Sequence, residues 1–197
     1  MPLPLHIFEE RYKAMIADCI RDERPFGVVL IAEGAAEGDT PVTPHAIGCT
    51  AEIAQVQPLE EGRMLIVTVG RERFRIVRLK QAEPYLVGLV EPAPLLAEDE
   101  EQLAESAARL EPLVSDYLDR LARLGHMEGR PDTALDDPAT LAYLGAALIQ
   151  LPPEQKQALL ALDRLTELSA ALRHFYHGEL ALMQTMPTSD IGLFSVN

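Results

Sequence analysis

The histidines are the residues of this sequence with the most familiar metal-binding and catalytic chemistry. His174 and His177 stand three residues apart in a segment of helical periodicity, so both imidazoles would lie on one helix face, as in many metal sites. Zinc catalysis needs three protein ligands, and this pair lacks a third. His45 lies in a long segment rich in glycine and proline. A metal-dependent or hydrolytic enzyme built on His45 or on the pair is therefore one alternative, and a solvent-exposed helix face is the simpler interpretation of the pair.

Motifs that would identify an enzyme are absent from the sequence. It has no Walker A phosphate loop, no Gly-x-Ser-x-Gly nucleophile elbow, no His-Glu-x-x-His metal motif and no glycine-rich dinucleotide fingerprint. We therefore predict that the chain has no catalytic residues and takes neither a cofactor nor a metal.

A cluster of basic residues occupies the segment RERFRIVRLK (71–80). Arg71, Arg73 and Arg75 occupy alternate positions and would share one face of a strand, where they could bind an anion or an acidic peptide. An edge strand guarded by charge against aggregation is the simpler interpretation. The apolar alternation changes sides at Ile76 and Val77. This predicts a β-bulge there, because only an extra residue can switch the faces of a strand.

The composition restricts the class of protein. Hydrophobic residues make up 48% of the 197 residues and charged residues 24%, as in ordinary globular proteins. The net charge of −14 opposes general binding to nucleic acid, because phosphate backbones are bound by cationic side chains. The two cysteines, Cys19 and Cys49, do not suggest a disulfide framework. No apolar run approaches the ~20 residues of a membrane span. The charge, the cysteines and this absence together predict a cytoplasmic protein without nucleic-acid or membrane partners.

The first half of the sequence predicts strands around one helix. The helix begins near Phe8 and ends before Pro25, and residues 32–46 form a long loop. Five segments have the alternation or the β-branched composition of strands: residues 26–31, 47–57, 64–70, 71–80 and 84–92. Short strands joined by tight turns indicate a small β-barrel or a curled antiparallel sheet.

The second half of the sequence predicts helices. Asp137 and Pro138 form a helix start signal, with an N-cap followed by proline at the first helical position. Pro112 predicts a kink or break in the first of these helices. The four expected helices span residues 97–125, 136–151, 153–162 and 163–184. The domains are therefore a β-domain (1–94), a helical bundle (95–186) and a tail (187–197).

Six segments of the sequence occur in an order that is typical of one family. They are PLPLHIFEERYKAMI (2–16), FGVVLI (26–31), IGCTAEI (47–53), EEGRMLIVTVGRERFRI (61–76), PYLVGLVE (84–91) and QLPPEQKQALLALDRLTELSAALRHF (150–175). In this order they resemble the N-terminal, substrate-binding domain of the Lon protease family. The resemblance implies an α+β fold, with a PUA-like β-barrel followed by a helical bundle. It also implies a non-catalytic module that recognises unfolded or extended polypeptide segments in proteolysis or protein quality control. RNA binding through a PUA-like fold is a third interpretation, which the net charge opposes.

A site for extended peptides requires a strand edge and an apolar floor. Phe8, Tyr12 and the loop 32–46 are our candidates for lining it. The alternative is that the two aromatic side chains only anchor the first helix to the sheet. His45 and the three arginines at 71, 73 and 75 complete the set of predicted binding residues.

The chain departs from the family pattern at three points. Glu10 stands where the family's helix motif usually has proline, a change that suits the first turn of a helix. The sequence contains neither an ATPase region nor a Ser-Lys peptidase region, and it lacks the family's additional strand before the Pro-Leu segment. A β-domain without its first strand would expose an open edge. We expect the apolar tail (190–196) or a second copy in a homodimer to cover that edge.

Overall fold

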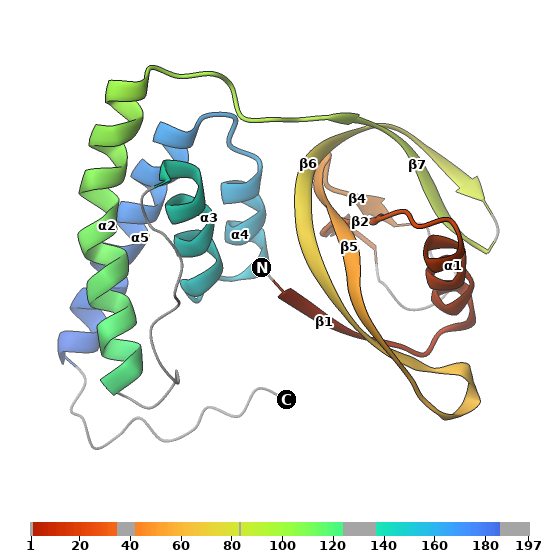
Figure 1. The fold of residues 1–197 in the computed structure, drawn as a ribbon. Helices are drawn as coiled ribbons and strands as arrows, with labels where there is room; N and C mark the ends of the chain where they lie inside the picture. Colours follow the sequence, from red (N-terminus) through yellow and green to blue (C-terminus); the bar gives the residue numbers. More distant parts are fainter. Residues whose placement is uncertain (1, 35–41, 83, 124–136, 186–197) are drawn as a thin grey trace. The chain divides into compact units, whose positions relative to one another are not determined.

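The structure is a computed structural model that describes residues 2–34, 42–82, 84–123 and 137–185 (Figure 1). The chain divides into two compact units: residues 1–94 with 152–161, here called the β-unit, and residues 95–151 with 162–197, here called the helical unit. Strands and helices together give the expected α+β class. The helical segment expected over 95–186 is not continuous, because residues 152–161 group with the β-unit.

The β-unit consists of a curled antiparallel sheet and two α-helices. Its elements are β1 (Pro2–Ile7), α1 (Glu10–Arg21), β2 (Phe26–Val28), β3 (Ile31–Glu33), β4 (Thr43–Pro44), β5 (Ile47–Pro58), η1 (Glu60–Gly62), β6 (Met64–Ala82), β7 (Tyr85–Pro92) and α4 (Pro153–Leu160). The main sheet has the order β1-β6-β5-β2, with β7 also paired to β6, while β3 and β4 pair separately. The sheet curves around α1 (Figure 1), and among the described strands it does not close into a barrel.

The start of the chain contains a strand that the sequence did not predict. The Pro-Leu segment is itself a strand, β1, which pairs antiparallel with β6 from Pro2 opposite Val69 to Ile7 opposite Met64. The side-chain hydroxyl of Thr68 adds a hydrogen bond of 3.1 Å to the carbonyl oxygen of Leu3. The sheet therefore has a strand where the sequence predicted none. The tail (187–197) lies outside the described residues.

Strand β6 is one long element that bends at bulges. The segments expected as two strands, 64–70 and 71–80, form a single strand of 19 residues. Its pairing with β5 shifts register opposite Thr50, whose side-chain oxygen accepts a hydrogen bond of 3.0 Å from the backbone N–H of Glu72. Its pairing with β7 shifts between Ile76 and Arg78. The predicted bulge at Ile76–Val77 is thereby confirmed.

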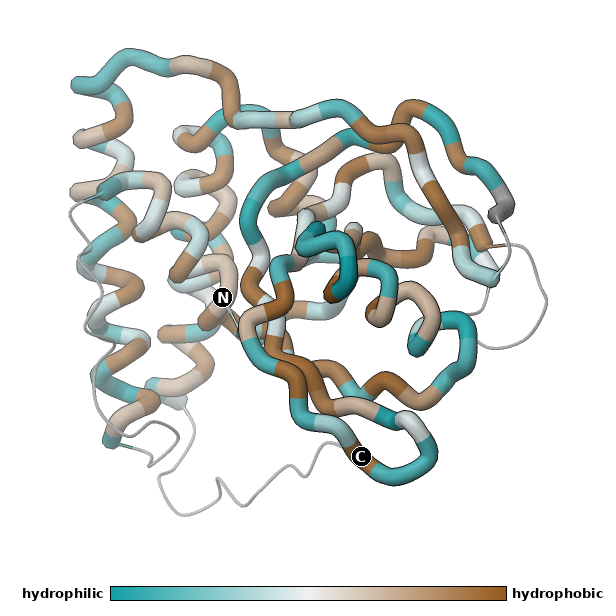
Figure 2. The backbone as a smooth tube through the Cα atoms, turned by 45° about the vertical axis from the view of Figure 1, so that its right-hand side comes forward, coloured by the Kyte–Doolittle hydropathy of each residue, from teal (hydrophilic) through white to brown (hydrophobic). Residues whose placement is uncertain are grey.

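The core of the β-unit lies between α1 and the concave face of the sheet. Figure 2 shows the apolar stretches along the strands that surround this helix. The buried residues of this core cluster are Ile7, Ile16, Cys19, Phe26, Ala51 and Ile66. Helix α4 is attached to β5 by Gln157, whose buried amide donates a hydrogen bond of 3.0 Å to the carbonyl oxygen of Ile47.

The helical unit packs three helices: α2 (Glu100–Arg123), α3 (Pro138–Leu148) and α5 (Leu165–Thr185). Helix α2 continues through Pro112, so the helix does not break there as the sequence predicted. Asp137 caps α3 as expected, because its carboxylate accepts a hydrogen bond of 2.7 Å from the backbone N–H of Thr140. The buried hydrophobic residues of this unit are Leu110, Val114, Tyr117, Leu118, Leu141, Ala142, Ile149, Leu165, Leu168, Leu172, Tyr176 and Leu180.

Helix α5 receives its N-terminal cap from a residue distant in the sequence. The Glu98 carboxylate accepts hydrogen bonds from the backbone N–H groups of Leu165 at 2.6 Å and Thr166 at 3.3 Å, and from the Thr166 hydroxyl. Partial burial raises the pKa of Glu98, but the hydrogen bonds from Thr166 and Leu165 outweigh burial and leave its pKa below the usual value of 4.5. The ionised carboxylate therefore stabilises the folded helical unit.

We expect Glu98→Gln to destabilise the helical unit by about 1 kcal/mol at pH 7, the usual effect of losing an N-cap. Because the folded pKa of Glu98 is lowered, its contribution is present above pH 4.5 and is lost as the pH falls through the folded pKa. Urea unfolding followed by circular dichroism at pH 7 and pH 3 should therefore show the difference from the wild type shrinking on acidification. Glu101→Gln, in the exposed first turn of α2, is the matched control. A difference that is the same at both pH values would contradict the capping role.

Candidate functional site

His45 joins two elements of the β-unit. Its backbone N–H donates to the carbonyl oxygen of Leu30 at 2.9 Å, and its ring Nε2 lies 3.2 Å from Oε2 of Glu154 in the first turn of α4. The side chain is 31% exposed. These contacts give His45 a structural partner on α4, and they connect the start of β5 to that helix.

The histidine pair lies on the other unit. His174 and His177 are exposed residues of α5, and the ring of His174 lies 5.9 Å from that of Phe175. Within the part of the chain that the structure describes, no three His, Cys, Asp or Glu residues are grouped so that they could hold a metal ion. Among the described residues, the histidine pair therefore lacks the third ligand that a metal-dependent enzyme would need.

The three arginines of the basic cluster do not form one exposed face. Arg73 is only 8% exposed, whereas Arg71 pairs with Glu52 at 2.5 Å and Arg75 lies 4.0 Å from Glu91. The bulge opposite Thr50 interrupts the alternation between Arg71 and Arg73, which the regular pattern assumed in the sequence could not show. At Arg71, Arg73 and Arg75 strand β6 is also not an edge strand, since its pairing with β5 extends to Arg75 and β1 and β7 pair on its other side. The interpretation as a charged edge strand is therefore wrong.

Phe8 and Tyr12 occupy different environments. Phe8 follows β1 and is 57% exposed, with its ring 5.5 Å from that of His6. Tyr12 is half-buried in α1, packs against the core of the β-unit and carries the Arg11 guanidinium 4.7 Å from its ring centre. Tyr12 therefore anchors α1, while Phe8 leaves an aromatic surface open to solvent. Residues 35–41 of the loop 32–46 lie outside the described residues, while 32–34 and 42–46 are described.

We expect alanine substitutions to separate the two aromatic residues. Tyr12→Ala should lower the stability of the β-unit by about 2–4 kcal/mol, since it removes a ring packed on the core. Phe8→Ala should change stability by less than about 0.5 kcal/mol, because the side chain is mainly exposed. Thermal unfolding of both variants, combined with peptide binding, makes the measurement. Weaker peptide binding by a fully folded Phe8→Ala variant would support a role for Phe8 in the site, and equal destabilisation by both variants would contradict this assignment.

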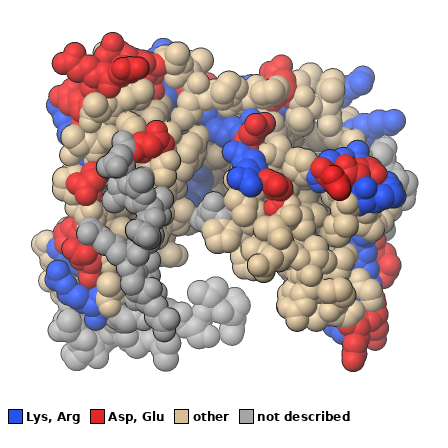
Figure 3. Space-filling view, viewed as in Figure 1, with Lys and Arg blue, Asp and Glu red and all other residues tan. Residues whose placement is uncertain are grey.

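Two hollows lie along β5. The first, of about 320 Å³, is lined by the end of α1 and by β5: Cys19, Ile20, Glu23, Arg24, Glu52, Ile53, Ala54, Gln55 and Val56. The second, of about 540 Å³, is lined by β1, β5 and β6: Pro4, Gln55, Val56, Gln57, Leu65, Ile66 and Val67. Gln55 and Val56 line both hollows. The surface over β1 is almost uncharged on the face that Figure 3 shows.

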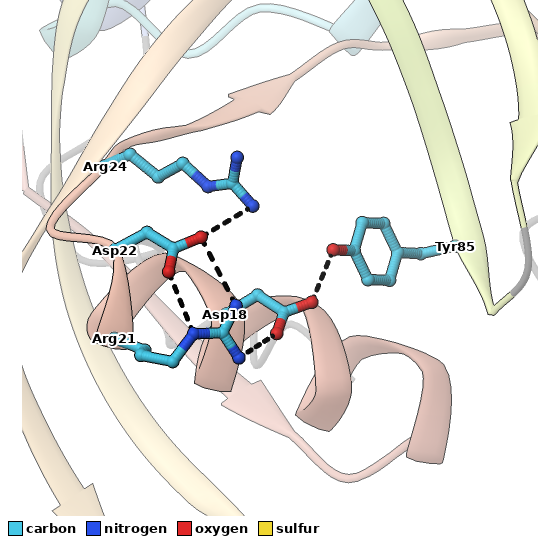
Figure 4. Close-up of polar contacts among 5 residues, drawn as sticks. All are labelled: Asp18, Arg21, Asp22, Arg24 and Tyr85. Atoms are coloured by element: carbon cyan, nitrogen blue, oxygen red, sulfur yellow. Dashed lines mark hydrogen bonds and ion pairs between the residues drawn. The ribbon is translucent and has the colours of Figure 1, made fainter.

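A polar network fixes the end of α1 beside the first hollow (Figure 4). The Tyr85 hydroxyl of β7 donates a hydrogen bond of 2.7 Å to Asp18, and Arg21 pairs with the same carboxylate at 2.8 Å. The hydrogen bonds from Tyr85 and Arg21 lower the pKa of Asp18, so it is ionised at neutral pH. Arg24 lies 3.1 Å from Asp22. The network thereby holds α1 against β7 and places Arg24 at the rim of the hollow.

Comparison with known proteins shows the family of this chain. The model of the ATP-dependent protease La (LON) substrate-binding domain matches residues 1–175. The chain belongs to this family. A Lon protease 2 from Myxococcus xanthus is 28% identical over 159 residues, and a Lon protease from Anaeromyxobacter dehalogenans is 26% identical over 159 residues. Each match covers 80% of this chain and 19% of the relative, so the chain spans about a fifth of the length of these proteases.

Solved structures show the same fold. The crystal structure of a Lon N-terminal domain protein from Xanthomonas campestris matches with a TM-score of 0.59 and 25% identity, covering 95% of this chain and 90% of that one. The N-terminal domain of the Lon protease of the Mycobacterium avium complex matches with a TM-score of 0.67 and 20% identity, covering 90% of both chains. The predicted Lon resemblance and α+β fold are confirmed. No helix among the described residues is long and apolar enough to span a membrane.

The hollows along β5 were missed by sequence reasoning. The sequence did contain a signal, because Glu52 is the only charged residue in EIAQVQP (52–58) and lysine is absent. Exposed edge strands usually carry charged side chains, lysine above all, which prevent pairing with other chains. A strand with one solvated face and few charges was therefore a candidate for a binding edge.

Proposed function

We propose that this chain is a non-catalytic recognition module that binds unfolded or extended polypeptide segments for proteolysis or protein quality control. The match of residues 1–175 to a protease substrate-binding domain carries the proposal. The curled sheet with its two hollows along β5 supports it, because side chains of an extended chain need apolar recesses beside a strand. The motifs of ATP hydrolysis and peptide hydrolysis are absent from the 197 residues, in accord with a module that binds substrates without processing them.

The cysteines and the net charge bear on where the chain acts and what it binds. Two free cysteines and no disulfide framework favour the cytoplasm. The net charge of −14 disfavours nucleic acid as a partner. The division into a β-domain that includes residues 152–161, a helical domain and a tail (187–197) belongs to the proposal as well. A homodimer formed through the open edge of the sheet at β1 is also part of it.

Binding of an unfolded protein tests the proposed function directly. We expect fluorescence anisotropy to show saturable binding of labelled, unfolded casein and of short extended peptides. A folded protein of similar size, labelled in the same way, should not bind. ATP turnover and casein cleavage should both stay at the level of a buffer blank. Failure to bind any unfolded polypeptide, or ATP turnover that persists through purification, would contradict the proposal.

A further inference from the structure

Strand β5 presents an open edge between the two hollows. On one side it pairs with β6 along its length, but on the other side β2 pairs only with Cys49, Thr50 and Ala51. No strand pairs with residues 52–58 on that side among the described parts of the chain. The residues from Ala54 to Pro58 are all exposed. An unpaired strand edge presents alternating backbone N–H and C=O groups, which an extended polypeptide complements.

Few charged side chains oppose the pairing of another strand with this edge. Glu52 is its only charged residue, and its carboxylate pairs with Arg71 at 2.5 Å. A register shift between Ile53 and Gln55 marks a bulge at Ala54. Bulges are frequent beside binding sites, where they redirect side chains. Here the bulge precedes Gln55 and Val56, the two residues that line both hollows.

The two hollows open toward opposite faces of the sheet at this edge. The first faces α1, where Ile20 is 45% exposed beside Ile53. Most residues that line the second belong to the other face: the register places Pro4 and Gln55 opposite Val67 and Gln57 opposite Leu65, and these positions alternate with the buried Ile66, which also borders the hollow. Leu65, 42% exposed, belongs to that outer face. A strand lying along the β5 edge would therefore have one hollow on each of its sides.

We propose that an extended polypeptide segment adds to the sheet as a strand along residues 52–57 of β5, with its side chains directed alternately into the two hollows. The inference rests on the proposed function and locates its site. Successive side chains of a strand point to opposite faces of the sheet, so one added strand would fill both hollows. Both floors contain apolar side chains, Ile20 and Ile53 on one face and Leu65 and Val67 on the other. The segment bound is therefore one with uncharged, mainly apolar side chains.

A second copy of this chain fits the edge less well than a foreign segment. Each copy carries a net charge of −14, so two copies repel each other. A short uncharged segment of an unfolded protein meets no such repulsion. The edge is therefore expected to bind an unfolded polypeptide. Pairing of two copies of this chain through the edge would contradict this.

Glutamate substitutions on the two faces test the site. Ile20→Glu and Leu65→Glu each place a charge in one hollow at a largely exposed position, so both variants should fold. We expect each to weaken binding of an uncharged extended peptide by about tenfold or more, and the double variant to weaken it further. Leu89→Glu, on β7 and 57% exposed, is the matched control and should change affinity less than about twofold.

Amide hydrogen exchange of the unmodified chain provides an independent measurement. Binding of the same peptide should slow exchange of backbone amides within residues 52–57 and leave β7 unchanged, because only an added strand forms new main-chain hydrogen bonds there. If the peptide bound without slowing amide exchange in β5, or bound both variants with full affinity, the proposed binding edge would be wrong. The proposed function would still hold. Concentration-dependent protection without peptide, with dimers in sedimentation, would show a second copy as the occupant. A chain that binds no peptide would overturn the proposed function itself.

Discussion

Gly48→Ala should unfold the β-unit at a markedly lower urea concentration than the wild type, with a loss of about 2–3 kcal/mol. A Cβ at Gly48 would lie 2.6 Å from Cζ of Phe74, 2.7 Å from Cγ2 of Val29 and 2.8 Å from the carbonyl oxygen of Val28. The ring of Phe74 is 5% exposed, and the third atom belongs to the backbone of a neighbouring segment. Neither can move away cheaply, because protein interiors are close-packed.

Gly88→Ala is the matched control for this prediction. It lies in β7 of the same sheet, and a Cβ there would meet its nearest atoms at 3.7 Å, an ordinary contact distance. Alanine should leave stability unchanged or raise it by up to about 1 kcal/mol, since glycine in a strand loses more backbone entropy on folding. Equal effects at the two positions would contradict the steric explanation.

The helices were the part of the fold that the sequence predicted best. Asp137 and Pro138 placed the start of α3 correctly, because an N-cap followed by proline acts through local hydrogen bonding and backbone geometry. Of the kink or break predicted at Pro112, the break does not occur, because α2 is continuous there. Proline in a helix costs roughly 3 kcal/mol, and the burial of Leu110 and Val114 on either side of it offsets that cost through packing that no local pattern shows.

Strand β1 escaped prediction because of its prolines. Proline lacks an N–H and usually signals a turn, so Pro2 and Pro4 argued against a strand. Residues two apart in a strand direct their N–H groups to the same edge, so both missing donors fall on one side of β1. In the described sheet β1 pairs only with β6, and a strand with one unpaired side tolerates them.

The sequence predicted the kind of site, a strand edge beside an apolar floor, but did not show where in the sheet it lies. The requirement for a strand edge beside an apolar floor follows from the chemistry of extended peptides. The edge itself depends on β2 ending at Val28 and on the bulge at Ala54, and both are consequences of sheet pairing across distant segments. The alternation of Arg71, Arg73 and Arg75 was misleading in part for the same reason, since the bulge opposite Thr50 separates Arg71 from the regular alternation of the other two.

Tyr176 takes part in the packing of all three helices of the helical unit. Its side chain is 0% exposed, and its ring meets that of Tyr117 edge-on with centres 5.3 Å apart. The hydroxyl donates a hydrogen bond of 2.8 Å to the carbonyl oxygen of Gly145 in α3. Burial raises the pKa of Tyr176, so the phenol keeps its proton and donates this hydrogen bond at neutral pH. One side chain therefore connects α5 to both other helices of the unit.

We expect Tyr176→Ala to destabilise the helical unit by about 3–5 kcal/mol, the usual effect of removing a buried aromatic ring. Tyr176→Phe should cost only about 0.5–1.5 kcal/mol, because the Gly145 carbonyl also accepts a hydrogen bond of 3.2 Å from the backbone N–H of Ile149 and so keeps a partner. Urea unfolding followed by helical circular dichroism measures both. Leu182→Ala, 57% exposed on the same helix, should stay within about 0.5 kcal/mol of the wild type. If the phenylalanine variant lost as much stability as the alanine variant, the hydrogen bond and not the packing of the ring would hold α3 to α5.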